Sequence, residues 1–165
     1  EVELFLNGKS LGTKRKQGDD LHLMWRVAWE PGTVKAIART GGKEVLTKEI
    51  HTAGKPARIL LEPDRTRMKA DGKDLSFVKV SILDAEGNVV PFADNLVKFQ
   101  VIGEGKLRAT DNGNPISMES FQAAERKAFH GLCLAVVQAS SKAGKITLKA
   151  SSDGLPEASV AIATE

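Results

Sequence analysis

Three histidines and one cysteine are the residues of this sequence best suited to metal binding or nucleophilic chemistry. His22, His51 and His130 lie far apart along the chain, and none belongs to a His-x-His, Glu-x-x-His or Cys-x-x-Cys spacing. Cys133 lies in the apolar run GLCLAVVQAS, where a small thiol packs as well as alanine. A Walker loop and a dinucleotide-binding glycine motif are also missing. We therefore predict no catalytic residue, no metal site and no cofactor.

The carboxylates are the second group that could carry chemistry. Glycoside hydrolysis needs two acids that flank a cleft at a set separation. The glutamates instead fall at expected strand ends and turns, which favours solvated loop carboxylates: Glu30, Glu44, Glu86, Glu104, Glu119 and Glu125. Five aspartates would be calcium ligands if their loops converged, although their spacing matches no calcium loop: Asp71, Asp74, Asp84, Asp94 and Asp111.

Two places could bind a carbohydrate. Trp25 and Trp29 stand four positions apart in an expected strand, on the same side as Val27, and aromatic rings are the usual platforms for sugar faces. A stripe of this kind is more often part of a core. The second place is the polar segment TDNGNPIS, residues 110–117, whose side chains could hydrogen-bond a hydroxylated ligand or simply form a turn. The candidate carbohydrate-binding residues are Trp25, Trp29, Asp111, Asn112 and Asn114.

The composition is that of a folded globular chain with an ordinary surface. Of the 165 residues, 41% are hydrophobic and 27% are charged, which is enough for a packed core. The 24 basic and 21 acidic residues are scattered, so no basic patch for nucleic acid is expected. No apolar run is long enough to span a membrane. The start EVELFLNGKS has neither an initiator methionine nor a signal peptide, so we expect a piece of a longer protein.

The elements that must position these residues are strands, because the apolar residues alternate with a period of two. We expect a meander over residues 2–6, 9–13, 21–30, 33–40 and 43–52, with Asn7-Gly8 as a hairpin turn. Gly54 and Pro56 interrupt the pattern. The sequence therefore predicts two domains, a small and partial β-sandwich-like module at 1–56 and a larger module at 57–165.

The larger module shows about seven strand segments separated by turn signals, as in an immunoglobulin-like sandwich. Val78, Val80 and Ile82 share one face of the longest segment and are predicted to face the core. A helical turn is expected only within residues 117–129. The predicted fold is all-β, with two immunoglobulin-like antiparallel β-sandwich modules, of which the first is small and truncated.

Longer segments resemble a known family. EVELFLNGKSLGTK, followed by WRVAWEPGTVKAIARTGGKEV, resembles the small β-domain after the catalytic barrel of bacterial glycoside hydrolase family 2 enzymes, chiefly β-galactosidases. ADGKDLSFVKVSILDAEGNVVPFADNLVKFQVIGEGKLRATDNGNP and ESFQAAERKAFHGLCLAVVQASSKAGKITLKASSDGL resemble their immunoglobulin-like C-terminal domain. The resemblance implies a parent enzyme that cleaves β-galactosides with retention through two glutamates of a (β/α)8 barrel. Neither glutamate has a counterpart here, and the family module has strand sequence before the segment that matches Glu1.

The sequence therefore favours a non-catalytic accessory region that supports or orients a catalytic barrel of the same parent chain. The family resemblance also implies a secreted or periplasmic location. One alternative is a carbohydrate-binding module with a polysaccharide as its partner. Another is an adhesion or stalk domain of the invasin type, because ADGKDLSFVKVSILDAEGNVVP and AGKITLKASSDG resemble bacterial immunoglobulin-like repeats, although the two halves are not repeats of each other. The oligomeric state stays open.

Overall fold

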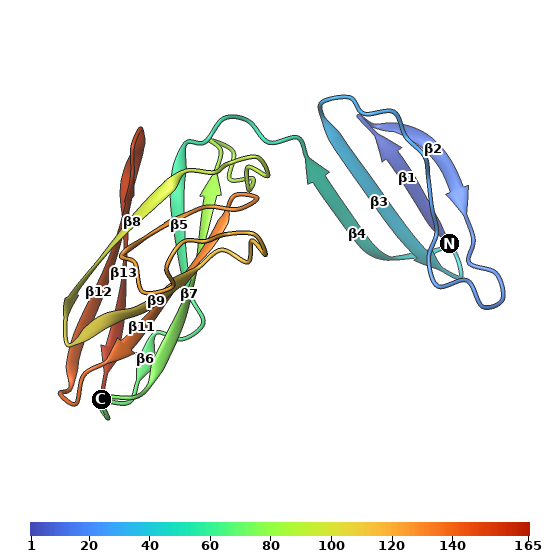
Figure 1. Cartoon of the computed structure of the whole chain (residues 1–165). Coiled ribbons are helices and arrows are strands. Elements are labelled where there is room, and N and C mark those ends of the chain that lie inside the picture. Colours follow the sequence, from blue (N-terminus) through green and yellow to red (C-terminus); the bar gives the residue numbers. More distant parts are fainter. The chain divides into compact units, whose positions relative to one another are not determined.

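The computed structural model describes the whole chain, Glu1–Glu165, as two compact units, Glu1–Thr52 and Ala53–Glu165 (Figure 1). All regular structure is β-strand, which confirms the all-β prediction. No helix is present that could cross a membrane. The second unit begins at Ala53 rather than at residue 57, because the residues just before the first strand of the sandwich already pack against it.

The first unit is one antiparallel sheet with the strand order β2-β1-β3-β4. Its strands are β1 (Val2–Leu6), β2 (Lys9–Lys14), β3 (Thr33–Thr40) and β4 (Lys43–His51). Asn7 and Gly8 both have positive φ, 51° and 80°, which is the conformation that an Asn-Gly hairpin turn requires. The unit thus provides a single layer of the predicted partial sandwich.

The prediction of a strand over residues 21–30 is wrong. The segment is irregular and pairs with no strand: both sides of β1 are occupied by β2 and β3, and the segment does not add to the outer edge of β2 or of β4. A strand forms only where a neighbour accepts and donates its backbone hydrogen bonds. The segment is held by other contacts, among them a 2.6 Å hydrogen bond from Lys14 Nζ to the carbonyl oxygen of Met24.

The first sheet contains little core. Val2, Leu4 and Leu6 alternate along β1 and so lie on one face, and each is only partly buried. No residue of Glu1–Thr52 is fully buried. The hydrophobic free energy that stabilises this sheet within the chain is therefore small, because it scales with the apolar area removed from water.

The second unit is a sandwich of two sheets. The five-stranded sheet contains, in order, β10 (Glu125–Lys127), β8 (Leu96–Gly103), β12 (Gly144–Ser152), β13 (Leu155–Thr164) and β6 (Arg67–Met68). The four-stranded sheet contains β5 (Arg58–Pro63), β7 (Leu75–Leu83), β11 (Leu132–Ala139) and β9 (Gly105–Asp111). All seven predicted segments form strands, and β6 and β10 are short additions. The helical turn expected within residues 117–129 is wrong, since β10 and turns occupy that stretch.

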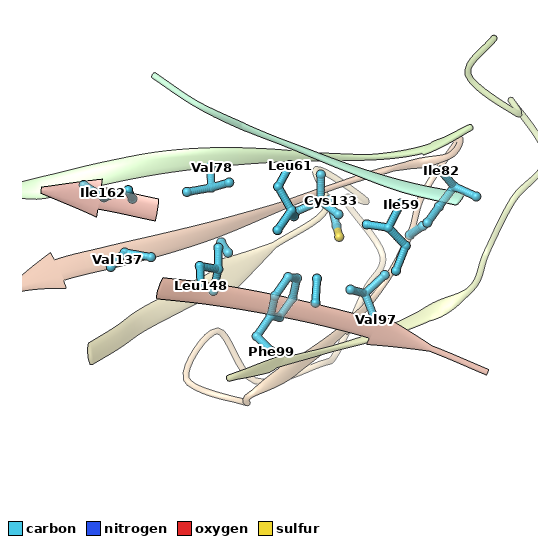
Figure 2. Close-up of a cluster of buried hydrophobic side chains, with 14 of the residues drawn as sticks. Ile59, Leu61, Val78, Ile82, Val97, Phe99, Cys133, Val137, Leu148 and Ile162 are labelled. Carbon is cyan, nitrogen blue, oxygen red and sulfur yellow. The ribbon is translucent and has the colours of Figure 1, made fainter. Parts of the chain in front are cut away.

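The core lies between the two sheets (Figure 2). Val78, Val80 and Ile82 of β7 are fully buried, as their alternation predicted, and on the opposite sheet so are Ile146 and Leu148 of β12. Each such side chain contributes about 1.5–3 kcal/mol relative to an exposed one. Further core residues come from the remaining strands, including Ile59, Leu61, Val97, Phe99, Cys133, Val137 and Ile162.

The chain crosses from one sheet to the other between β8 and β9. Gly103 has a φ of 96°, and a Cβ built there would collide with the carbonyl oxygen of Lys145. A Cβ at Gly105 would lie 2.8 Å from the carbonyl oxygen of Gln138. Both positions require glycine because the crossing passes directly against β11 and β12.

Candidate functional site

The candidate site that the structure defines best is the β9–β10 loop, residues 112–124, which follows the predicted carbohydrate-binding residue Asp111. Asp111 Oδ1 accepts hydrogen bonds from the backbone N–H groups of Asn112, at 2.7 Å, and Gly113, at 3.2 Å. Asn114 Oδ1 accepts the N–H of Ile116 at 3.1 Å. These polar side chains are engaged by the loop itself, as in Asx turns.

Asn112 connects the loop to β10. Its Oδ1 accepts the N–H of Asn114 at 3.0 Å, and its Nδ2 donates to the carbonyl oxygen of Lys127 at 3.0 Å. The structure thus brings Asp111, Asn112 and Asn114 together, as the sequence suggested, but their hydrogen-bonding groups hold the backbone of the loop. A hydroxylated ligand would have to compete with these internal bonds.

Arg126 of β10 organises the loop from beneath. Its side chain is only 1% exposed. The guanidinium Nη2 donates to the carbonyl oxygens of Thr110 and Ser120, each at 2.8 Å, and Nη1 donates to that of Glu119 at 3.2 Å. The ring of Phe121 lies 5.5 Å from the guanidinium carbon. A buried charge is tolerated only when its donors are satisfied, so this network fixes the loop.

Glu119 balances the charge of Arg126. Their closest atoms, Arg126 Nη1 and Glu119 Oε2, are 3.6 Å apart. Burial alone would raise the pKa of Glu119, but hydrogen bonds from the N–H of Lys127 and the hydroxyl of Ser117, together with the charge of Arg126, hold that pKa below its ordinary value. Glu119 is therefore ionised at neutral pH and forms an ion pair within the loop.

The loop presents apolar side chains to solvent. The exposed fractions are 83% for Ile116, 97% for Met118 and 62% for Phe121. Exposed apolar side chains that group together on one loop mark a candidate interaction surface. We call Ile116, Met118 and Phe121 the apolar loop surface.

The two predicted tryptophans have different environments. Trp29 is 81% exposed, whereas Trp25 is partly buried and its indole N–H has no hydrogen-bond partner. Lys14 Nζ lies 5.2 Å from the centre of the Trp25 ring, in cation–π contact. The two rings are therefore neither buried together in a core nor exposed together as a platform for a sugar. The strand that would have aligned them does not form.

The remaining chemistry-bearing residues are engaged in local structure. Thr33 Oγ1 and Nδ1 of His51 are 2.9 Å apart, and Nδ1 of His130 lies 3.2 Å from the carbonyl oxygen of Pro91. Asp84 accepts hydrogen bonds from Gly54 N–H and from Asn88. No three His, Cys, Asp or Glu side chains are grouped so that they could hold a metal ion. The five aspartates considered as calcium ligands are therefore not brought together in this structure.

Two side chains of nucleophilic type, Ser10 and Cys133, also belong to local structure. Residues 8–12 spell a Gly-x-Ser-x-Gly pattern, but they lie in the β1–β2 hairpin rather than at a strand-to-helix turn. Ser10 Oγ donates to Glu3 at 2.7 Å. Cys133 is buried as predicted, and this burial raises its pKa to about 12, so the thiol is protonated and unreactive at neutral pH.

Sequence reasoning missed Arg126, the residue on which the loop depends. All three residues of the tripeptide Glu-Arg-Lys at 125–127 are charged, so nothing in the sequence marks the central arginine as buried. Its partners are mostly backbone carbonyls, which leave no trace in the sequence. The apolar residues at 116, 118 and 121 were the available signal, since they interrupt an otherwise polar stretch.

Comparison with known proteins gives consistent matches over both units. Residues 59–161 match the family model described as glycoside hydrolase family 2 C-terminal domain 5, and residues 1–46 match a model described as a domain of unknown function. The chain is 59% identical, over all 165 residues, to the β-galactosidase BoGH2A of Bacteroides ovatus, of which it spans 19%. It is 34% identical over 127 residues to a β-galactosidase of Thermoanaerobacter pseudethanolicus, covering 77% of this chain and 15% of that protein.

Solved structures agree with these matches. A family 2 glycosyl hydrolase from Bacteroides cellulosilyticus superposes on 98% of this chain with a TM-score of 0.92 and 40% identity, and the match covers 22% of that protein. A β-glycosidase from Bacteroides vulgatus gives a TM-score of 0.92 at 33% identity over 98% of this chain and 21% of its own. The chain thus spans about a fifth of the length of these relatives, and it belongs to the glycoside hydrolase family 2 C-terminal domain 5 family.

Proposed function

We propose that this chain is a non-catalytic accessory region of a family 2 glycoside hydrolase of the β-galactosidase type, which supports or orients the catalytic domain of the same longer protein. The observation that carries the proposal is the full-length match to BoGH2A, in which the matching region is only 19% of the protein. The proposal includes the secreted or periplasmic location that the family resemblance implies.

Two features of the structure favour this accessory role over ligand binding and over a stalk. The polar side chains of the β9–β10 loop, such as Asn112 and Glu119, are used to hold the loop rather than to face an open cleft. The two units also differ, one a single sheet and the other a two-sheet sandwich, whereas a stalk is built from copies of one module.

The test compares three forms of the B. ovatus enzyme: the natural protein, a form lacking the region that matches this chain, and a chimera in which this chain replaces that region. We expect the deletion to lower both the thermal midpoint and the hydrolysis of a β-galactoside, and the chimera to restore them, because the lost contacts return. An unchanged midpoint and rate after the deletion would refute a supporting role.

Carbohydrate binding is the second candidate, favoured by the 81% exposure of Trp29. Isothermal titration of the 165-residue chain with β-galactosides and plant polysaccharides separates the two functions. The supporting role predicts no binding heat. Saturable binding that disappears in a folded Trp29→Ala variant would assign the chain to carbohydrate binding instead.

A further inference from the structure

The β9–β10 loop is fixed before it meets any partner. Arg126, with its side chain 1% exposed, donates to three backbone carbonyl oxygens at 2.8–3.2 Å, and Glu119 accepts the N–H of Lys127 at 3.0 Å. A surface that is already ordered loses little conformational entropy on binding, which favours tight contact with a partner. The loop therefore has the rigidity expected of a docking element.

The face that the loop presents is apolar and uncharged. Ile116, Met118 and Phe121 are 83%, 97% and 62% exposed. Glu119 is the single charged residue among residues 112–124, and Arg126 neutralises it from below. Such a face offers hydrophobic area and an aromatic anchor, the composition of an interface centre, and it offers no charge that would recognise nucleic acid or an acidic surface.

We infer that the apolar loop surface docks on the catalytic domain of the longer family 2 enzyme. This inference rests on the proposed function and names the surface through which that function is exerted. The partner is chosen because about four fifths of BoGH2A, and a similar share of the B. cellulosilyticus structure, lies outside the region that this chain matches. A covalently linked domain is present at high effective concentration, so a patch of three side chains is sufficient to keep the two domains in contact. Its receiving surface is apolar.

Met118 is a built-in reporter of docking. A solvent-exposed thioether is oxidised readily by dilute hydrogen peroxide, whereas a covered one is protected. Met118 oxidation is measured by peptide mass spectrometry in the isolated chain and in the chimera with BoGH2A. Buried Met68, 2% exposed, serves as the internal reference. We expect Met118 to react roughly tenfold more slowly in the chimera, because a docked hot spot favours the closed state by about that factor.

Substitutions identify the surface. In the chimera, Ile116→Ser and Phe121→Ser should each return the oxidation rate of Met118 towards that of the isolated chain. Ile116→Ser should disturb folding less than Phe121→Ser, because the ring of Phe121 contacts Arg126 whereas the side chain of Ile116 is almost fully exposed. The matched control is Ile102→Ser, an exposed aliphatic residue on β8 outside the loop, which should leave the protection unchanged.

The outcomes are distinct. Equal oxidation of Met118 in the isolated chain and the chimera would overturn the inference, even if deleting the whole region destabilises the enzyme as the proposed function requires. Protection that grows with the concentration of the isolated chain would identify a second copy as the partner, and would overturn it as well. Protection in the chimera that is insensitive to Ile116→Ser and Phe121→Ser would show that these side chains do not hold the contact, and it would overturn the inference too.

Discussion

At the scale of single residues, the buried carboxylate of Asp84 has a structural role in the second unit, because it accepts hydrogen bonds from backbone N–H groups. Asp84 is 1% exposed and accepts the N–H of Gly54 at 2.8 Å and that of Asn88 at 2.7 Å. Asn88 Nδ2 adds a third hydrogen bond at 3.1 Å. Asp84 thereby ties the segment that enters β5 to the turn after β7, two parts of the chain that are remote in sequence.

This carboxylate predicts an acid-dependent stability. The N–H of Gly54 first, and Asn88 with it, hold the pKa of Asp84 at about 2, below its ordinary value of 3.8, although burial acts in the opposite direction. The folded state therefore binds the proton less readily than the unfolded chain. The contribution of Asp84 to the free energy of unfolding is complete above about pH 4 and is lost as the pH falls towards 2.

Urea unfolding between pH 7 and pH 2 tests this prediction. Asp84→Asn should lower the free energy of unfolding at pH 7 and flatten its decline below pH 4, because the amide has one acceptor oxygen and no charge. The matched control is Asp153→Asn in the exposed β12–β13 turn, which should follow the unsubstituted chain. A decline of equal steepness in the chain and in Asp84→Asn would contradict the assignment.

Residue environments were the least predictable level. Val78 and Val80 were assigned to the core correctly, since a strand in a sandwich alternates between core and solvent. Arg126 was not recognised, because its burial depends on where the backbone carbonyls of a loop come to lie. Asp111, Asn112 and Asn114 were placed correctly in one polar loop, but the sequence could not distinguish bonds to a ligand from bonds to the loop's own backbone.

At the scale of elements, hydrophobic alternation and turn residues located the strands well. All seven strands predicted in the larger module form, and so do four of the five predicted before residue 52. The exception, residues 21–30, has a suitable pattern but no neighbouring strand in this chain. A β-strand needs a neighbouring strand to hydrogen-bond with, so the alternation of apolar residues alone cannot guarantee that one forms.

The crossing between β8 and β9 gives a prediction about glycine. Gly103→Ala should destabilise the sandwich by about 2 kcal/mol or more, because the methyl group would meet the carbonyl oxygen of Lys145 in addition to the strain of a positive φ. Gly154→Ala shares the positive φ, 78°, but has open space around it, and should cost about 1 kcal/mol. Chemical denaturation of both variants measures the difference, and equal costs would show that the crossing relaxes around the methyl group.

At the scale of the whole molecule, burial is distributed very unequally. The 52 residues of the first unit include no fully buried residue, whereas the second unit contains the whole hydrophobic core. The sequence did not reveal this difference, because Val2, Leu4 and Leu6 alternate as regularly as the core residues of β7. Whether an apolar face is covered depends on a second layer, which the strand pattern does not specify.

Hydrogen exchange of the isolated chain should reveal this inequality. We expect backbone amides in β1–β4 to exchange roughly a hundredfold or more faster than those in β7, β11 and β12, since local stability follows buried apolar contacts. Mass spectrometry of peptides from each unit measures the ratio. The β5–β7 pair, which belongs to the sandwich, is the internal standard. Equal protection in the two units would contradict this prediction.

The pairing of β6 with β13 has a consequence for synthesis on the ribosome. Arg67 lies opposite Ala163 in a parallel ladder, so two strands at opposite ends of the module must meet to complete the five-stranded sheet. Contacts this distant in sequence form late and slowly. During translation, the edge of β12 that pairs with β13 stays open until β13 has left the exit tunnel, so the five-stranded sheet is completed only by the last strand of the module.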